Sequence, residues 1–138
     1  MTAIAVTEDI AACLRIRETV FTGEQGVSRE EDVDGRDPEA IHLLATRDGI
    51  AIGTARILIK GEVGKIGRVA VLKETRGLGI GRDLMLSALD QCRAQGLTRA
   101  TLGAQTHALA FYEALGFTAI GPEFMDAGIP HREMVAEL

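Results

Sequence analysis

A glycine-rich segment, Arg76-Gly77-Leu78-Gly79-Ile80-Gly81, constrains the fold of this chain more than any other stretch. An apolar run precedes it at residues 69–72, and from residue 82 to residue 95 the apolar residues recur at helical spacing. The segment is therefore predicted to be a tight turn between a strand and a helix. Backbone N–H groups at a helix N-terminus lack partners within the helix, and glycines leave room for an anion to approach them. The pattern predicts a phosphate-binding turn, with a turn that binds nothing as its alternative.

The spacing of these glycines excludes two common nucleotide-binding motifs. A dinucleotide fingerprint needs G-x-G-x-x-G, but counting from Gly77 and Gly79 the third glycine would fall at Arg82. A P-loop needs Gly-Lys-Ser/Thr, whereas Gly81 is followed by arginine. The pattern that remains is Arg/Gln-x-x-Gly-x-Gly/Ala, which Arg76, Gly79 and Gly81 satisfy.

Apolar periodicity and turn residues predict the remaining elements. We expect strands at residues 3–6, 41–47, 50–60, 65–72, 99–104, 117–120 and 131–136, and helices at residues 8–23, 82–95 and 106–115. Asp48-Gly49 predicts a hairpin, and the strand after the crossover helix should run parallel to the strand before it. The predicted fold is α/β, a mixed and mostly antiparallel sheet with helices on both faces. The hairpin argues against a flavodoxin-like nucleotide binder, which needs successive βαβ units.

An acidic segment, residues 24–39, follows the first predicted helix. We expect it to be a solvated loop that forms one lip of an acceptor site. Its Asp32-x-Asp34-Gly35 sequence has the wrong spacing for an EF-hand, where a third oxygen ligand would fall at Arg36. No metal site is therefore predicted.

Length and composition indicate one globular domain, predicted to span residues 1–138, since 46% of the 138 residues are hydrophobic. The net charge of −5 argues against binding to nucleic acid, because such binding depends on neutralising phosphates. Cys13 and Cys92 lie among apolar residues of predicted helices, as buried thiols of a reduced protein do. Because the sequence shows neither a leader-like segment nor an apolar run long enough to span a membrane, we expect a soluble, cytoplasmic protein with no membrane contact.

A second motif follows the glycine-rich turn. Residues 108–117, ALAFYEALGF, match A-x-x-F-Y-E-x-L-G-F. With both motifs in this order, the chain resembles the GNAT superfamily of N-acetyltransferases over essentially its whole length. Four short stretches resemble a small bacterial branch, the ElaA/YjcF-like proteins: Val20-Phe21, Glu24-Gln25-Gly26-Val27, Asp34 and Gly128-Ile129-Pro130-His131. Gln105 departs from the pattern, because many relatives have asparagine before the second motif.

The resemblance implies an N-acetyltransferase that uses acetyl-CoA and needs neither a metal nor a covalent enzyme intermediate. In this family the turn binds the pyrophosphate of acetyl-CoA and the preceding strand hydrogen-bonds the pantetheine arm. The cofactor-binding residues that it implies here are Val69, Val71, Arg76, Gly77, Leu78, Gly79, Ile80, Gly81 and Arg82. A backbone N–H near Val71 would polarise the thioester carbonyl and hold the oxyanion. Tyr112, the only tyrosine, would protonate the departing thiolate, and its alternative is a core residue with its hydroxyl at the rim.

The acceptor amine must lose a proton, so a base is expected. His131 is the first candidate and Glu24 the second; the alternatives are a histidine that hydrogen-bonds a loop and an ordinary solvated carboxylate. Arg17 and Arg68 are candidate substrate-binding residues that would favour an acceptor with a carboxylate or phosphate. Otherwise they are surface charges whose stems pack over the core.

The expected partner is a small-molecule amine whose identity does not follow from the sequence, and dimers are common in this superfamily. A competing hypothesis is a CoA-binding module that senses acyl-CoA or presents it to a partner without turnover. Tyr112 and His131 argue against that module, because it needs neither an acid nor a base.

Overall fold

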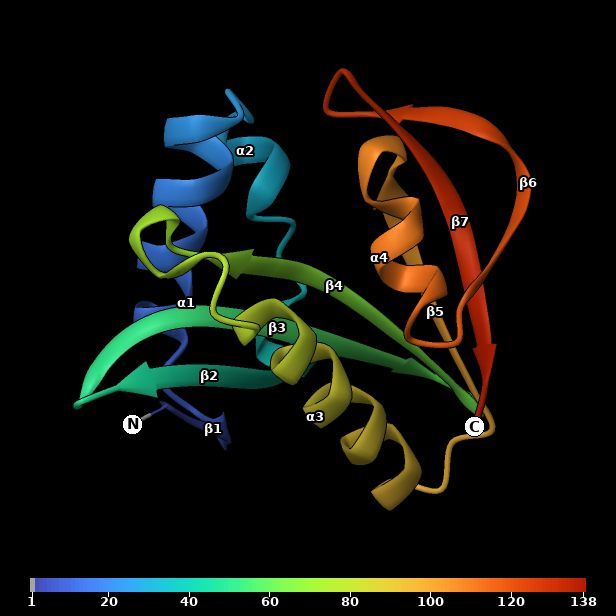
Figure 1. Ribbon diagram of the computed structural model, residues 1–138, viewed down its shortest axis with the longest axis horizontal. Coiled ribbons are helices and arrows are strands. Elements are labelled where there is room, and N and C mark those ends of the chain that lie inside the picture. Colours follow the sequence, from blue (N-terminus) through green and yellow to red (C-terminus); the bar gives the residue numbers. More distant parts are fainter. Residues whose placement is uncertain (1) are drawn as a thin grey trace.

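The computed structural model describes residues 2–138 (Figure 1). Its elements are β1 (Thr2–Thr7), α1 (Ile10–Arg17), α2 (Arg29–Asp32), β2 (Ile41–Arg47), β3 (Ile50–Lys60), β4 (Val63–Val71), α3 (Ile80–Ala94), β5 (Arg99–Gln105), α4 (Leu109–Glu113), β6 (Thr118–Asp126) and β7 (Ile129–Glu137). Further helical turns cover Glu18–Glu24, Asp37–Glu39, Lys73–Thr75 and Thr106–Ala108. The strands form one sheet in the order β1-β2-β3-β4-β5-β7-β6, in which β4 and β5 are parallel and the other neighbours antiparallel. The predicted mixed α/β fold is confirmed.

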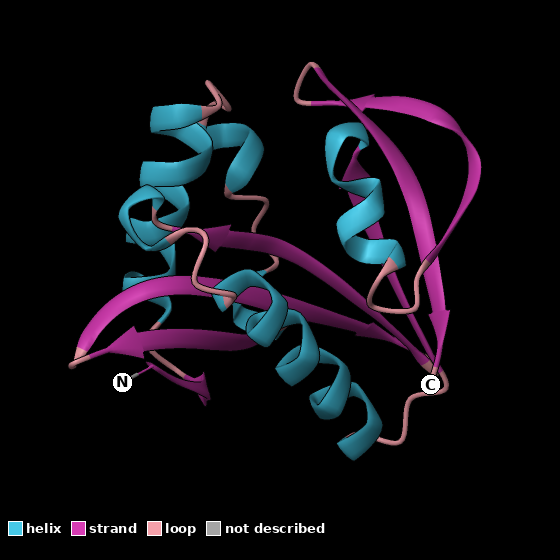
Figure 2. Ribbon diagram, in the orientation of Figure 1, coloured by secondary structure: helices cyan, strands magenta, loops and turns pink. Residues whose placement is uncertain are grey.

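Helices cover both faces of this sheet, as Figures 1 and 2 show. α3 packs against β2, β3 and β4 on one face, and α1 packs against the same strands on the other. The buried residues of α3 recur at helical spacing: Ile80, Leu84, Met85, Ala88, Leu89 and Cys92. Gly53 of β3 allows the close approach of α3, because a Cβ there would lie 3.0 Å from Leu84 Cδ1. Cys13 and Cys92 are buried free thiols, as predicted. Within residues 2–138, no helix is both long and apolar enough to cross a membrane.

The predicted hairpin turn between β2 and β3 occurs where the sequence places it. Asp48 and Gly49 have φ values of 53° and 80°, the left-handed conformation that an Asp-Gly hairpin turn requires. The β6–β7 hairpin differs from the prediction. Residues 121–130, which lie between the predicted strands 117–120 and 131–136, belong largely to β6 and β7. The register of β6 shifts between Ile120 and Phe124, around Gly121-Pro122. Because β6 is an edge strand, this interruption is tolerated and the strand continues.

The acidic segment is not the solvated loop that we expected. Ser28 accepts a hydrogen bond from the N–H of Glu31, and the Glu31 carboxylate accepts one from the N–H of Ser28, which forms a capping box that starts α2. Asp32 and Asp37 are buried. The Ser-x-x-Glu spacing is a helix-start signal that could have predicted α2 from the sequence.

Candidate active site

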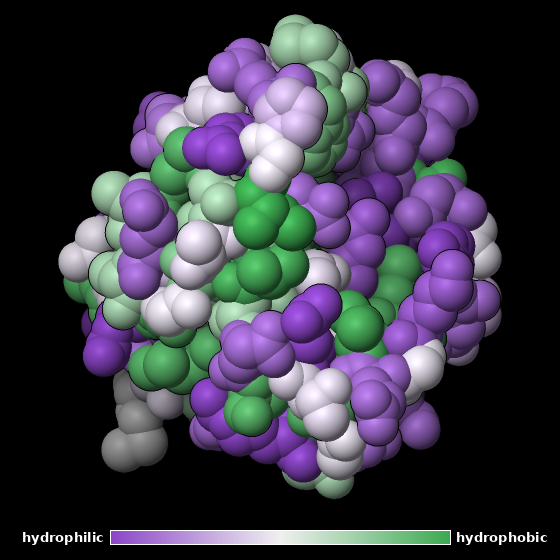
Figure 3. Space-filling view, turned by 90° about the vertical axis from the view of Figure 1, so that its right-hand side faces the viewer, coloured by the Kyte–Doolittle hydropathy of each residue, from purple (hydrophilic) through white to green (hydrophobic). Residues whose placement is uncertain are grey.

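The sheet opens between β4 and β5. These strands pair only at residues 63–65 with residues 99–101, and beyond this point they diverge (Figure 1). A cavity of about 500 Å³ lies at the opening, lined by β4, β5, α4, the β6–β7 hairpin and the acidic segment. Figure 3 shows the side that carries β6 and β7, where hydrophilic residues surround a hollow. Of the predicted site residues, Arg68, Val69, Tyr112 and His131 line this cavity, and residues 76–82 do not.

The glycine-rich turn leaves the N-terminus of α3 without a side-chain cap. Gly77 and Gly79 have φ values of 82° and 78°, a left-handed conformation that favours glycine. Gly79 is the N-cap of α3, and no side chain caps the helix. A Cβ on either glycine would meet no atom within 4 Å, so an anion has room to approach the first N–H groups. Leu78 and Arg82 are exposed, whereas Ile80 is buried in the core.

Arg76 connects the turn to two other segments. Its Nε donates to the carbonyl of Val71 at 3.1 Å, and its two terminal nitrogens donate to the Glu24 carboxylate at 2.7 and 2.8 Å. The hydrogen bonds from Arg76 lower the pKa of Glu24, which makes this carboxylate a weaker base. Glu24 does not line the cavity, so the structure does not bring it beside the other candidate acceptor residues. Gly81 lies in the first turn of α3, where a Cβ would be 3.8 Å from both Phe111 and Val71.

A bulge in β4 places Arg68 and Val69 at the cavity. The β3–β4 register shifts between Thr54 and Arg56, and Arg68 has a φ of 51°, which is unusual for a residue with a Cβ. Arg68 donates to the carbonyl of Asp32 from Nε at 3.2 Å and from Nη2 at 3.1 Å. Burial lowers the pKa of Arg68. The bulge therefore turns the β4 backbone at the point where β5 has already separated from it.

Tyr112 lies on α4 and lines the cavity from the β5 side. Its ring makes edge contacts with Phe111 at a centroid distance of 5.0 Å and with Phe117 at 6.2 Å. Burial raises the pKa of the Tyr112 hydroxyl. The group therefore remains a proton donor at neutral pH.

His131 lies on β7 and is only 9% exposed. Its Nδ1 is 2.7 Å from the carbonyl of Ile129, and its ring stacks on Phe124 at 5.8 Å with an interplanar angle of 24°. A carbonyl accepts but cannot donate, so this contact assigns the proton to Nδ1 in the neutral ring and leaves Nε2 as the acceptor. Because His131 also lines the cavity, the geometry allows Nε2 to take a proton from a bound molecule.

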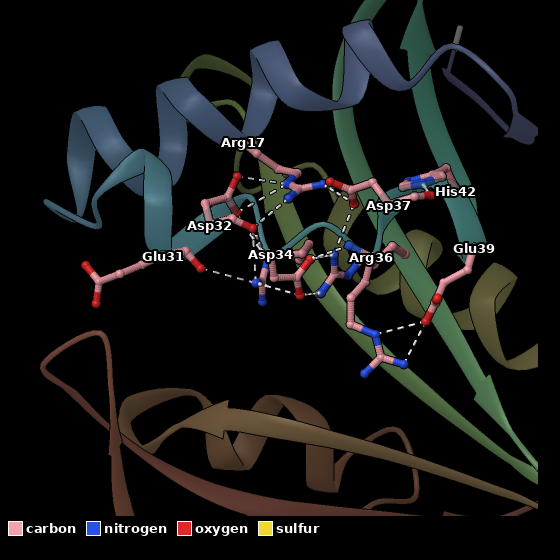
Figure 4. Close-up of polar contacts among 10 residues, drawn as sticks. Arg17, Glu31, Asp32, Asp34, Arg36, Asp37, Glu39 and His42 are labelled. Carbon is pink, nitrogen blue, oxygen red and sulfur yellow. Dashed lines mark hydrogen bonds and ion pairs between the residues drawn. The ribbon is translucent and has the colours of Figure 1, made fainter.

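Arg17 is part of a buried ion-pair network and not of the cavity (Figure 4). The side chain is 1% exposed; its Nε donates to both oxygens of Asp32 at 3.2 and 3.1 Å, and Nη1 donates to Asp37 at 2.7 Å. Nη2 donates to the carbonyl of Asp32 at 2.9 Å. Because every guanidinium nitrogen of Arg17 is bound within the protein, the structure does not bring Arg17 to the cavity as the prediction required.

Asp37 joins two arginines of this network. It accepts hydrogen bonds from Arg17 and, at 3.0 Å, from Arg56, while its backbone carbonyl accepts one from Nε2 of His42 at 2.8 Å. Burial alone would raise the pKa of Asp37, but the two arginines outweigh it and the pKa is lowered. The hydrogen bond from Arg56 likewise holds the pKa of Asp34 far below its usual range. The acidic segment thus pairs with arginines, and within residues 2–138 no group of three or more His, Cys, Asp or Glu side chains could hold a metal ion.

The grouping of several cavity residues has no signal in the sequence. Gln105 donates to Gln25 at 2.9 Å and contacts Nε2 of His107 at 2.6 Å, although Gln25 and Gln105 are 80 residues apart. Glu31 and Asp126 also line the cavity, from α2 and from the end of β6. Only the fold brings these side chains together, because no spacing rule relates their positions.

A sheet that opens at one parallel pair, a helix N-terminus without a side-chain cap, and a cavity lined by a tyrosine and a histidine are the arrangement expected of an acetyltransferase. The chain belongs to the GNAT family: residues 18–138 match the acetyltransferase (GNAT) domain. It is 35% identical over 132 residues to the uncharacterized N-acetyltransferase YjcF of Bacillus subtilis, covering 94% of each chain. The crystal structure of Escherichia coli ElaA matches with a TM-score of 0.88 and 29% identity over 99% of this chain and 100% of that one. An acyl-CoA N-acyltransferase from Pseudomonas aeruginosa matches with a TM-score of 0.88 and 30% identity over 99% of both chains. These matches confirm the predicted family and its ElaA/YjcF-like branch.

Proposed function

We propose that the chain transfers the acetyl group of acetyl-CoA to a primary amine of a small molecule by direct attack. One observation carries this proposal: Tyr112 and His131 line the same cavity as Val69 of β4, where β4 and β5 diverge. A proton donor, a proton acceptor and a strand with free backbone groups are what acyl transfer to an amine requires.

The turn and β4 fit the proposed donor. The first N–H groups of α3, at Ile80, Gly81 and Arg82, would hold the pyrophosphate, since the adjoining glycines carry no Cβ that would block it. Beyond residue 65, β4 no longer pairs with β5, and its backbone near Val69 and Val71 could bond the pantetheine arm. Acetyl-CoA would supply the acetyl group as an activated thioester. The match to an acyl-CoA N-acyltransferase supports this donor class.

Three groups of the chain would perform the transfer. Nε2 of His131 would accept the proton that the amine loses as its nitrogen bonds to the acetyl carbon. A backbone N–H near Val71 would stabilise the negative charge on the carbonyl oxygen. Tyr112 would donate its hydroxyl proton to the sulfur as the carbon–sulfur bond breaks, and its raised pKa keeps that proton in place until then.

Of the predicted substrate-binding residues, Arg68 alone stays in the proposed site. It lines the cavity, but its guanidinium already contacts Asp32 and Asp34, which weakens the case for an anionic acceptor. The cytoplasmic location and the homodimer remain predictions.

The test is a panel of amines incubated with acetyl-CoA, with release of free thiol as the readout and mass spectrometry of the product. We expect turnover on at least one amine. Tight CoA binding without turnover on any amine would favour the alternative, a non-catalytic acyl-CoA sensor. The Gly79→Val variant is the control, because blocking the turn should remove enzyme-dependent thiol release.

A further inference from the structure

The arginines of the cavity wall are already neutralised by the protein itself. Arg36, Arg56 and Arg68 line the cavity. Their ion pairs are Arg36–Glu39, Arg56–Asp34, Arg56–Asp37, Arg68–Asp32 and Arg68–Asp34. An anionic acceptor would have to displace one of these internal carboxylates, so the wall offers little net attraction to a negative charge.

Two carboxylates at the cavity, those of Glu31 and Asp126, form no ion pair with a lysine or arginine within residues 2–138. Glu31 accepts a hydrogen bond from the N–H of Ser28 at 3.2 Å, and Figure 4 shows its carboxylate directed away from the arginines. The side chain of Asp126, at the end of β6, forms no hydrogen bond or ion pair within residues 2–138. Among residues 2–138, Lys65 is the one lysine or arginine that lines the cavity without an ion pair. It lies where β4 still pairs with β5. The unpaired negative charge of the cavity therefore comes from Glu31 of α2 and from Asp126 beside the β6–β7 turn.

The proposed base lies on the same hairpin as Asp126. His131 is nine-tenths buried, and its Nε2 has no partner within residues 2–138. Phe124 is opposite His131, and Asp126 is opposite Ile129, so these four side chains share one face of the hairpin. Ile129 and His131 are two positions apart along an extended strand, about 7 Å, which an alkyl chain of about four or five carbons spans. The ring of Phe124 stacks on His131 and offers an apolar surface beside it.

We propose that the acceptor is a short linear diamine, with one amino group at His131 and the other, as an ammonium ion, at Asp126 and Glu31. This inference rests on the proposed function and adds the substrate class. One nitrogen bonds to the acetyl carbon as the carbon–sulfur bond breaks. His131 takes the proton of that nitrogen and Tyr112 supplies a proton to the sulfur. The product is a monoacetylated diamine whose second ammonium remains paired with the carboxylates.

The test compares three ligands of similar length by calorimetric titration, in the absence and in the presence of saturating CoA. The ligands are 1,4-diaminobutane, 1-aminobutane and 4-aminobutanoate. Partly exposed charge pairs each change an equilibrium constant by up to about fivefold, so two carboxylates should make the diamine bind about tenfold more tightly than the monoamine. The double variant Glu31→Gln, Asp126→Asn should lose that preference, and glutamine at position 31 retains the capping box.

The matched control is Glu30→Gln, Glu123→Gln, which removes the same two charges from α2 and β6 at exposed positions outside the cavity. This control should keep the full diamine preference. Equal binding of diamine and monoamine, tighter binding of 4-aminobutanoate, or an equal loss in both double variants would overturn the inference. Thiol release with 1-aminobutane alone would leave the acetyltransferase proposal standing. If no amine is acetylated, the proposed function fails, and the titration still decides whether the cavity selects diamines.

Discussion

Glu24 and Arg76 are 52 residues apart and form a two-pronged ion pair, with nitrogen–oxygen distances of 2.7 and 2.8 Å. Nε of the same guanidinium binds the carbonyl of Val71, so one side chain links the end of β4, the glycine-rich turn and the helical segment Glu18–Glu24. The carboxylate of Glu24 occupies both terminal nitrogens of Arg76, an arginine of the turn where an anion is proposed to bind. Glu24 and a bound phosphate would therefore compete for Arg76.

We expect Glu24→Gln to bind CoA more tightly than the native chain, by up to about fivefold, because an exposed ion pair contributes no more than this. The difference should shrink at high salt, which screens exposed charges. Titration of CoA at low and high salt measures both effects. Glu18→Gln is the control, since it removes one exposed charge from the same helical segment. Weaker CoA binding in Glu24→Gln alone would show that the pair positions Arg76 for the phosphate.

Gly79→Val should abolish CoA binding. The residue has a φ of 78° at the N-cap of α3, and a branched side chain there would both strain the backbone and fill the space proposed for the pyrophosphate. Gly61→Val is a matched control, because Gly61 has a φ of 61°, an equally open surrounding and a position in the β3–β4 turn. Both variants should lose similar stability in urea unfolding, but only Gly79→Val should fail to bind CoA. An unchanged dissociation constant in Gly79→Val would refute the proposed site.

Tyr112→Phe should lower turnover by about 100-fold, the lower end of what a general acid contributes, because a CoA thiolate is already an acceptable leaving group. The dissociation constant for CoA should change little, since the substitution removes only the hydroxyl and keeps the ring contacts with Phe111 and Phe117. Steady-state thiol release and CoA titration separate the two quantities. Loss of CoA affinity with unchanged turnover would instead assign the hydroxyl to binding.

The elements that were predicted correctly from the sequence are those determined by residues close to one another in the chain. The glycine-rich turn, the Asp48-Gly49 hairpin and the helical spacing of α3 each depend on residues within a few positions of one another. The parallel direction of β4 and β5 also followed, from the general rule that strands joined by a crossover helix run parallel. Of the candidate site, Tyr112 and His131 could be placed at the cavity because they belong to short stretches that resemble the family.

The partners of the arginines could not be predicted in this way. Arg17 follows the spacing of an amphipathic helix, but whether it meets solvent, substrate or a carboxylate depends on how residues 29–39 fold back over it. That segment has a mostly polar composition, which suggested solvent exposure, while burial of Asp32 and Asp37 depends on pairing with distant arginines. Side chains that meet only through tertiary structure leave no periodic signal.

The buried pairing of Asp37 makes stability depend on pH. The folded-state pKa values of Asp34 and Asp37 lie below that of an unfolded aspartate, about 3.9, so the unfolded state binds more protons in acid. Their contribution is therefore complete at neutral pH and is lost as the pH falls from about 5 through the lowered folded-state values.

Asp37→Asn should destabilise the fold by about 3 kcal/mol at pH 7, because it leaves Arg17 and Arg56 buried without one of their carboxylates. The gap between variant and native chain should narrow as the pH falls below the unfolded-state pKa of about 3.9, because the unfolded aspartate then binds a proton that the folded Asp37 does not. Urea unfolding at neutral pH and at about pH 2.5 measures both differences. Asp90→Asn is the control, since Asp90 forms an exposed pair with Arg93 on α3 and should change stability by less than about 0.5 kcal/mol. A gap between Asp37→Asn and the native chain that stays constant with pH would mean that Asp37 stabilises the fold through hydrogen bonding alone and not through its charge.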